Sequence, residues 1–193
     1  MGIGRPKQYD PERAIELAVD LFWQHGYSDT SMDDLLRSMQ LSKSSFYQAF
    51  KSKKQLFLRC LDFYIEKTHR EFSDRLNASR SGKQFFDQLL KNVITDRDFG
   101  CRGCLITNSA NEFAQSDAEI STKINQGFNV YRKLFLKAVE TGQRDGSIGN
   151  KYTAGLITDY LLTNINGLRT LVKAGTPKKT LADTARIIVN SLN

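Results

Sequence analysis

Apolar side chains recur at intervals of three and four residues along nearly the whole of this 193-residue chain. Ala14, Leu17, Ala18, Leu21 and Phe22 show the pattern near the start, and similar stripes continue to the end. Side chains at this spacing share one face of an α-helix. Segments with the alternating pattern of a strand are missing from the sequence. The sequence therefore predicts an all-α protein.

Cap residues and glycines divide this pattern into about nine helices. The expected N-caps are Asp10 for the first helix, Thr30 with Asp33 for the second, Ser42 for the third, and Ser52, in a full capping box with Gln55, for a long fourth helix. Later helices are expected at residues 84–97, 104–113, 117–141, 151–173 and 177–192. We therefore expect a small N-terminal domain, residues 1–52, followed by a larger helical domain, residues 53–193.

The segment Ser31–Phe50 has the spacing of two short helices joined by a tight turn. On the second helix, Phe46 and Phe50 share an apolar face that would pack against the first. The opposite face presents Lys43, Ser44, Tyr47 and Gln48, with Ser45 near its edge. Short polar side chains let a helix approach base edges, and glutamine pairs with adenine and lysine with guanine. The segment therefore predicts a helix-turn-helix motif, at residues 31–50, that binds the DNA major groove.

The formal charge of the chain is +7, and positive residues cluster around this segment. Between Leu35 and Arg59 there are six basic residues and no acidic ones. Lys53 adds a cation at the start of the long helix, and Arg5 and Lys7 form a separate basic arm. Such a block attracts polyanions. On charge alone, a solvated surface face is the simpler explanation.

Composition excludes several other classes of protein. The apolar runs are shorter than a membrane-spanning helix requires, and the first ten residues lack the apolar region of a signal peptide. Three cysteines are too few for a disulfide-stabilised scaffold. The two histidines lie far apart in the sequence, and no Ser/His/Asp arrangement is evident. We expect a cytoplasmic, nucleoid-associated protein that is not an enzyme, with no membrane partner, cofactor or metal.

Four sequence elements together resemble the N-terminal domain of TetR-family transcriptional regulators. They are GRPK (residues 4–7), LFWQHGY (21–27), TSMDDL (30–35) and SKSSFYQAFKSKKQL (42–56). The resemblance implies a bacterial homodimer of all-helical subunits that binds a double-stranded DNA operator through the first domain and an effector through the second. The residues that it places at the operator are Lys43, Ser45, Tyr47 and Gln48, with Lys53 at the phosphate backbone and Asp33 at the groove edge. Gln40 and Ala49 depart from the family pattern, which commonly has Gly or Ala and His at these positions.

The last two expected helices carry apolar stripes. The stripe residues are Ile157, Leu161, Ile165, Leu168 and Val172 in one helix and Leu181, Ala185, Ile188 and Leu192 in the other. A subunit core is the ordinary use of such stripes. In the TetR family the corresponding helices form a four-helix bundle with the partner subunit, and Gly167 would permit close approach. We therefore expect a homodimer whose recognition helices reach half-sites about one helical turn apart.

A ligand pocket in the second domain is implied by the family resemblance. Its candidate lining residues are Asn108, Asn111, Phe128, Tyr131, Tyr160 and Asn164. Apolar walls with a few polar groups suit a small organic molecule. The alternative is that the aromatic residues fill the core and the asparagines cap helices or face solvent.

Cys101 and Cys104 flank Arg102 and Gly103. Arg102 beside a helix N-terminus would favour the reactive thiolate of either cysteine. Residues 103–105 also resemble a subset of TetR-like regulators, some of which sense electrophiles or oxidants through a cysteine here. A structural role is the first interpretation of these cysteines and sensing the second. Metal binding comes third, because a zinc site needs four ligands.

The sequence thus predicts a DNA-binding transcriptional regulator. We expect a homodimeric repressor that a small hydrophobic or electrophilic inducer releases from its operator. Two alternatives from other classes stay open, namely a Cys-x-x-Cys thiol-disulfide protein and a helical adaptor that binds protein through the basic face.

Overall fold

The computed structural model describes residues 10–95, 102–113 and 116–193. All regular secondary structure in these ranges is α-helical, which confirms the predicted fold class. The helices are α1 (Pro11–His25), α2 (Met32–Met39), α3 (Lys43–Phe50), α4 (Lys53–Ala78), α5 (Gly82–Thr95), α7 (Leu105–Phe113), α8 (Ala118–Arg144), α9 (Ala154–Lys173) and α10 (Lys178–Asn190). Within the described ranges, none of these helices is long and apolar enough to cross a membrane.

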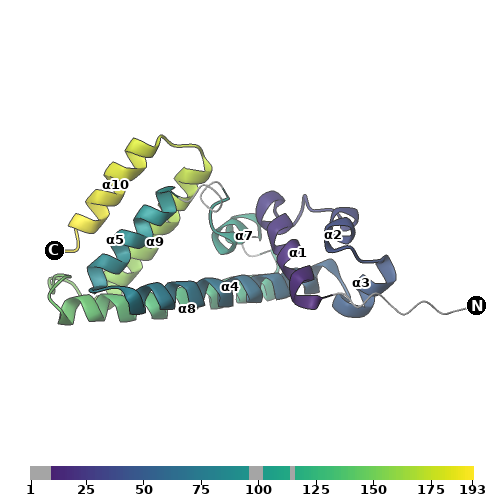
Figure 1. Ribbon diagram of the computed structural model, residues 1–193, viewed down its shortest axis with the longest axis horizontal. Helices are drawn as coiled ribbons and strands as arrows, with labels where there is room; N and C mark the ends of the chain where they lie inside the picture. The colour runs from purple at the N-terminus through teal and green to yellow at the C-terminus, as the bar shows by residue number, and fades with distance from the viewer. Residues whose placement is uncertain (1–9, 96–101, 114–115) are drawn as a thin grey trace, which may run out of the picture.

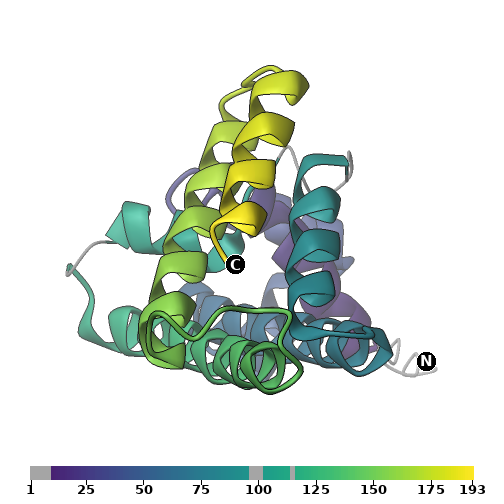
Figure 2. The same cartoon turned by 90° about the vertical axis from the view of Figure 1, so that its left-hand side faces the viewer.

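Two long helices connect the two ends of the molecule (Figure 1). Helices α4 and α8 lie side by side and run in the same direction: Lys54 near the start of α4 pairs with Asp117 just before α8, and Gly82 beyond α4 donates to Asp145 just after α8. Helices α1, α2 and α3 lie at one end of this pair, with α7 close by. Figure 2 shows α5, α9 and α10 rising together from the other end.

Three of the predicted N-caps are confirmed. The Asp10 carboxylate accepts from the amides of the first turn of α1, at 3.0 and 3.3 Å. The Ser42 hydroxyl accepts from the amide of Ser45, and the Ser52 hydroxyl from the amide of Gln55, both at 3.1 Å. These bonds satisfy amides that have no partner inside the helix, so helices α1, α3 and α4 begin where the sequence predicts.

The predicted cap of α2 and the second half of the predicted capping box of α4 need correction. Ser31 rather than Thr30 caps α2, because its hydroxyl accepts from the amide of Asp34 at 3.1 Å and donates to the carboxylate of that residue at 2.6 Å. Thr30 is buried, and its hydroxyl donates to the carbonyl of Gly26 at 2.6 Å. The capping box at the start of α4 is only half formed, since the amide of Ser52 donates to the carbonyl of Phe50 at 2.7 Å and the side chain of Gln55 donates to Glu119 at 3.3 Å.

The later helices form with shifted ends. Helix α5 begins at Gly82, where a Cβ atom would lie 2.3 Å from the carbonyl oxygen of Ala138, so the glycine permits close contact with α8. Helix α8 continues to Arg144, beyond the predicted end. Helix α9 begins at Ala154 because the hydroxyl of Thr153 accepts from the amide of Leu156 at 3.3 Å. Glycines mark close packing here rather than helix ends.

Buried apolar side chains form two clusters. The first joins α1, α2 and α3 to the first half of α4, to α7 and to α8, and includes Phe22, Phe46 and Phe57. The second joins α5, the second half of α8, α9 and α10, and includes Phe86 and Phe135. The first cluster continues across the predicted domain boundary, so α4 belongs to the core of the N-terminal helices as well.

The apolar stripes of α9 and α10 fill the second cluster. Leu161, Ile165 and Leu168 are buried, as are the stripe residues of α10. The stripes therefore serve the subunit core, which is the ordinary use expected for them. A different set of large apolar side chains on and beside these helices is exposed, and it comprises Tyr152, Leu156, Tyr160, Leu171 and Ile187.

Candidate DNA-binding surface and ligand cavity

Helix α3 presents one polar face to solvent. Phe46 and Phe50 are buried on its opposite face. The residues predicted to contact DNA on the polar face are Lys43, Ser44, Tyr47 and Gln48, and all four are exposed. Tyr47 is held by edge-on contact with the ring of Phe46, with 5.4 Å between ring centroids. The helix thus offers a row of donors and acceptors of the kind that reads base edges.

The serines of α3 interact with one another at its N-terminus. The hydroxyl of Ser42 lies 3.0 Å from that of Ser44 and 2.8 Å from that of Ser45. Ser45 is half-buried, so its side chain belongs to the cap as much as to the exposed face. Lys43, Tyr47 and Gln48 extend further into solvent and are the stronger candidates for base contacts.

The turn between α2 and α3 is tight and contains a left-handed residue. Gln40 has φ 54° and ψ 38°, a conformation that favours glycine over residues with a Cβ atom. The amide of Leu41 donates to the carbonyl of Leu36 at 3.0 Å and closes the turn. Asp33, predicted at the groove edge, is exposed on α2. The backbone therefore places α2 and α3 in the helix-turn-helix arrangement despite the unfavourable residue.

The lysines after α3 have different surroundings. The ammonium of Lys53 lies 4.4 Å from the centre of the Tyr27 ring, and burial lowers the pKa of Lys53. The ammonium of Lys54 is held by the carboxylates of Asp117 at 2.8 Å and Glu119 at 3.0 Å, and these hydrogen bonds raise its pKa. Lys54 is thus engaged within the protein. The basic arm, Arg5 and Lys7, lies outside the described residues.

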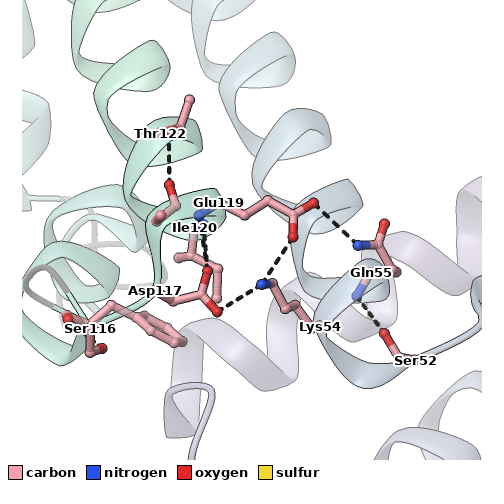
Figure 3. Close-up of polar contacts among 10 residues, drawn as sticks. Ser52, Lys54, Gln55, Ser116, Asp117, Glu119, Ile120 and Thr122 are labelled. Carbon is pink, nitrogen blue, oxygen red and sulfur yellow. Dashed lines mark hydrogen bonds and ion pairs between the residues drawn. The ribbon is translucent and has the colours of Figure 1, made fainter.

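A polar cluster joins the start of α4 to the start of α8 (Figure 3). Asp117 caps α8 by accepting from the amides of Glu119 and Ile120, at 3.0 and 3.1 Å. The same carboxylate pairs with Lys54, while Glu119 accepts from Gln55. The first turn of α4 is therefore fixed to the first turn of α8.

A second contact joins α7 to the loop between α1 and α2. The carboxylate of Glu112 accepts from the amides of Tyr27 at 2.9 Å and Ser28 at 2.6 Å. Burial opposes ionisation of Glu112, but the hydrogen bonds from Ser28 and Tyr27 outweigh it and hold the pKa of Glu112 below its usual value. We call the contacts of Glu112 and Lys54 the linking contacts. They connect the DNA-facing helices to α7 and α8.

A cavity of about 440 Å³ lies between α1, α4, α5 and α9. Its lining includes the buried side chains of Val19 and Trp23 on α1, Tyr64 and Phe72 on α4, and Leu89 and Val93 on α5. Arg102, Gly103 and Arg169 complete one side. This volume suits a small organic molecule. Because α1 forms one wall, an occupant would touch the DNA-binding end directly.

None of the six residues predicted for the ligand pocket lines this cavity. Tyr131 is buried and Phe128 partly buried in the first core. The side chain of Asn108 donates to the carbonyl of Arg102 at 2.8 Å, and that of Asn164 to the carbonyl of Tyr160, also at 2.8 Å. Asn111 and Tyr160 are exposed. The structure does not bring these six side chains together around one space.

Cys104 immediately precedes α7 and is buried beside Arg169 and Tyr64. The hydroxyl of Tyr64 donates to the Cys104 sulfur at 3.8 Å. Burial opposes ionisation of this thiol, but the positive charge of Arg169 and hydrogen bonds from Thr107 and Tyr64 outweigh it, so the pKa of Cys104 is lowered. Burial alone raises the pKa of Cys60. Of the two described cysteines, Cys104 is thus the one whose pKa is lowered.

Arg169 rather than Arg102 supplies the charge beside Cys104. The guanidinium of Arg102 pairs with Asp20 at 3.0 Å and lies 4.3 Å from the centre of the Trp23 ring. The sequence analysis missed Arg169, although an arginine four residues after Ile165 on an apolar stripe is a signal for a buried charge. Cys101 lies outside the described residues. Among the residues that the structure describes, no group of three or more His, Cys, Asp or Glu side chains is arranged to bind a metal.

Comparisons with known proteins agree with this architecture. Residues 14–60 match the family described as "Bacterial regulatory proteins, tetR family". The chain is 26% identical over 186 residues to the HTH-type transcriptional repressor BdcR of Escherichia coli, covering 94% of this chain and 88% of that protein. It is 24% identical over 176 residues to the repressor ComR of the same organism, covering 89% and 83%.

A solved structure of similar fold contains DNA. It is a cysteine variant of the TetR family transcriptional regulator CifR complexed with double-strand operator DNA. The TM-score is 0.85 at 24% sequence identity, and the match covers 98% of this chain and 100% of that one. At this identity the likeness establishes the fold.

Proposed function

The chain belongs to the TetR family of transcriptional regulators, and we propose that it is a homodimeric repressor that binds a near-palindromic operator and is released by a small molecule. The observation that carries the proposal is the exposed polar face of α3, backed by a buried aromatic face. The family consists of regulators rather than enzymes, so a thiol-disulfide enzyme is excluded. A helical adaptor that binds protein remains as the alternative that the experiment below tests.

In the proposed complex α3 lies in the major groove. Lys43, Tyr47 and Gln48 contact base edges or adjacent phosphates, with Ser44 and Ser45 allowing the close approach. Asp33 lies at the groove edge, and Lys53, at the N-terminus of α4, contacts the phosphate backbone. The arm with Arg5 and Lys7 adds further phosphate contacts.

The proposed dimer face consists of the exposed apolar residues of α9 and α10. Leu156, Tyr160, Gly167 and Leu171 follow one another at helical spacing on α9, and Ile187 is 66% exposed on α10. A Cβ atom at Gly167 would meet nothing within 4 Å, so this side of α9 is open to another helix. Contiguous exposed apolar side chains of this kind mark interaction sites. A twofold axis here would present two copies of α3 to a palindromic operator.

Release from the operator is proposed to follow from occupation of the cavity. An occupant contacts α1 on one wall and α4, α5 and α9 on the others. It also contacts Arg102 and Gly103, just before α7, and a displacement of α7 would reach the loop before α2 through the linking contacts of Glu112. A ligand acts in this way only if it binds the released conformation more tightly than the operator-bound one.

The surroundings of Cys104 support a second mode of release, by thiol-reactive compounds. Its thiol has a lowered pKa, and the residue directly precedes α7, whose far end carries Glu112. Alkylation or oxidation would add volume where the sulfur is packed and displace α7. Cys101 is proposed to act with Cys104 if a second thiol is required.

Selection of operator fragments from genomic DNA, followed by fluorescence anisotropy at physiological salt, tests the proposal. We expect a selected fragment to bind at least a hundredfold more tightly than random DNA, with a steep salt dependence. Gln48→Ala should remove much of this preference, whereas the matched control Gln88→Ala, at an exposed position of α5, should not. Equal affinity for all fragments, or weak salt dependence, would favour the adaptor.

A further inference from the structure

The cavity carries more positive than negative side chains, and its carboxylates lie at the exposed side. Five cationic and three acidic residues line it. Glu16 is engaged by Arg13 at 3.1 Å and Lys67 at 4.0 Å, and Asp20 by Arg102 at 3.0 Å. The third acid, Glu71, is exposed. Negative charge is therefore concentrated at the rim of the cavity.

Arg169 has no carboxylate partner among the described residues. It lies partly buried at the inner side of the cavity, with its guanidinium carbon 5.8 Å from the centre of the Phe72 ring. The groups that face it are Cys104, Tyr64 and Tyr131. Burial opposes the charge of Arg169, but these three groups outweigh it and raise the pKa of Arg169. None of them is a carboxylate, so a ligand carboxylate would add a full negative charge beside the guanidinium.

The walls around Arg169 are aromatic. Trp23 comes from α1, and Phe63, Tyr64 and Phe72 come from α4. Rings that line a cavity of this size favour an apolar ligand that carries aromatic rings. The aromatic walls and the cation of Arg169, which has no carboxylate partner among the described residues, together define a ligand with an apolar ring and a negative group.

We propose that the cavity binds a small aromatic carboxylate, whose carboxylate pairs with Arg169 while its rings lie among Trp23, Phe63 and Phe72. The inference rests on the proposed function, which makes this cavity the effector site. Arginine binds carboxylates through two parallel hydrogen bonds, which gives both affinity and orientation. Arg169 then interacts with two groups at once, the ligand carboxylate and the sulfur of Cys104.

Binding can be followed through Trp23, because it is the one tryptophan in the sequence. The probes are 3,3-diphenylpropanoate and its uncharged counterpart 3,3-diphenylpropanamide, titrated against the full chain with tryptophan fluorescence and calorimetry. We expect the carboxylate to bind at least about tenfold more tightly than the amide. Arg169→Met should abolish this preference. Arg75→Met, which removes another cation of the lining, should preserve it.

A second measurement uses the unaltered protein, so it does not depend on the folding of Arg169→Met. Alkylation of Cys104 by iodoacetamide is followed against pH by peptide mass spectrometry, where trypsin cleavage after Arg102 separates Cys101 from Cys104. The bound carboxylate should move the midpoint of the profile to higher pH, because it neutralises the charge of Arg169. The bound amide should slow alkylation at every pH without moving the midpoint.

The outcomes separate this inference from the proposed function. Equal binding of carboxylate and amide, loss of the preference in Arg75→Met alone, or an unmoved Cys104 profile with the carboxylate bound would each overturn the assignment to Arg169. Operator binding without probe is measured on the same preparation. If the protein binds its operator but shows no preference for the carboxylate, it is still a regulator, and only the proposed ligand class is wrong. If it does not recognise an operator, the proposed function itself is wrong.

Discussion

The DNA-facing helices and the cavity differ in how far apart their residues lie along the chain. The proposed operator contacts on α2, α3 and the start of α4 fall within residues 33–53. The cavity is lined by residues from Arg13 to Arg169, contributed by α1, α4, α5 and α9 and by the segment before α7. Local spacing and caps determine the first region, whereas tertiary packing alone creates the second.

The two regions also differ in how their charges are held. Lys43 and Gln48 extend into water from a buried aromatic backing. Arg169 lies against Cys104, Tyr64 and Phe72, so its charge is part of the packing. Substitutions on the polar face of α3 should therefore change DNA affinity with little effect on folding. Substitutions of charged residues in the cavity should affect both ligand binding and stability.

Removal of a ring from the buried face of α3 should have the largest effect. Phe46 is fully buried, so Phe46→Ala should lower the free energy of unfolding by about 3–5 kcal/mol. Phe63→Ala removes a ring of similar size from the partly buried cavity wall and should cost about 1–2 kcal/mol. Urea denaturation compares the two variants. Equal losses would show that the cavity wall is packed as tightly as the α3 core.

A substitution in the proposed dimer face should weaken operator binding without changing ligand binding in the cavity. Ile187→Asp places a charge on an exposed apolar residue of α10. We expect monomers in sedimentation velocity and a loss of operator affinity of about a hundredfold, because two half-sites must be bound together. Binding of 3,3-diphenylpropanoate should change less than twofold. The control is Gln88→Asp on α5. A dimeric Ile187→Asp protein would place the interface elsewhere.

Glu112 connects the two regions and provides a pH-dependent test. The side chain accepts two backbone hydrogen bonds from the loop before α2. Glu112→Gln should lower the free energy of unfolding by about 1 kcal/mol near neutral pH, while Glu140→Gln, at an exposed site on α8, should not. Urea midpoints measured against pH provide the comparison.

The sign of the pH effect follows from the lowered pKa of Glu112 in the folded protein. Its stabilisation is fully present above the unfolded pKa, about 4.3. It is lost as pH falls through the lower folded value, where both states carry a proton. The difference between Glu112→Gln and the unaltered protein should therefore disappear at that acid pH. A constant difference across the whole range would mean that the glutamine disturbs packing instead.

The DNA-facing region could be predicted from the sequence because the signals that define it are local. The caps at Asp10, Ser42 and Ser52 and the spacing of Phe46 and Phe50 are short-range rules, and all of them hold in the structure. The error at α2 came from two adjacent residues that can both cap. Ser31 makes the cap because it reaches the Asp34 amide, while Thr30 turns inward to the carbonyl of Gly26.

The cavity could not be predicted in the same way, because no local rule pairs residues that lie far apart in the sequence. The pocket candidates Asn108 and Asn164 were chosen for their polarity, yet their side chains bond nearby carbonyl groups. The partners of Lys54 lie more than sixty residues away on the segment that begins α8. The position of Arg169 on an apolar stripe signals a buried charge, but its pairing with Cys104 could not be predicted, because only the fold brings the two together.

The smallest expected effect concerns the turn between α2 and α3, where Gln40 occupies a position that favours glycine. Gln40 adopts a left-handed conformation, so Gln40→Gly should raise the free energy of unfolding by about 0.5–1 kcal/mol, after the added entropy of the unfolded glycine is counted. Gly146 has φ 76° and open space around it, so Gly146→Ala should lower stability by about 1 kcal/mol through the same backbone preference. Urea denaturation measures both. If Gln40→Gly destabilises the protein instead, the side chain of Gln40 must stabilise the turn by more than its backbone strain costs. The helix-turn-helix would then depend on a side-chain contact as well as on local spacing.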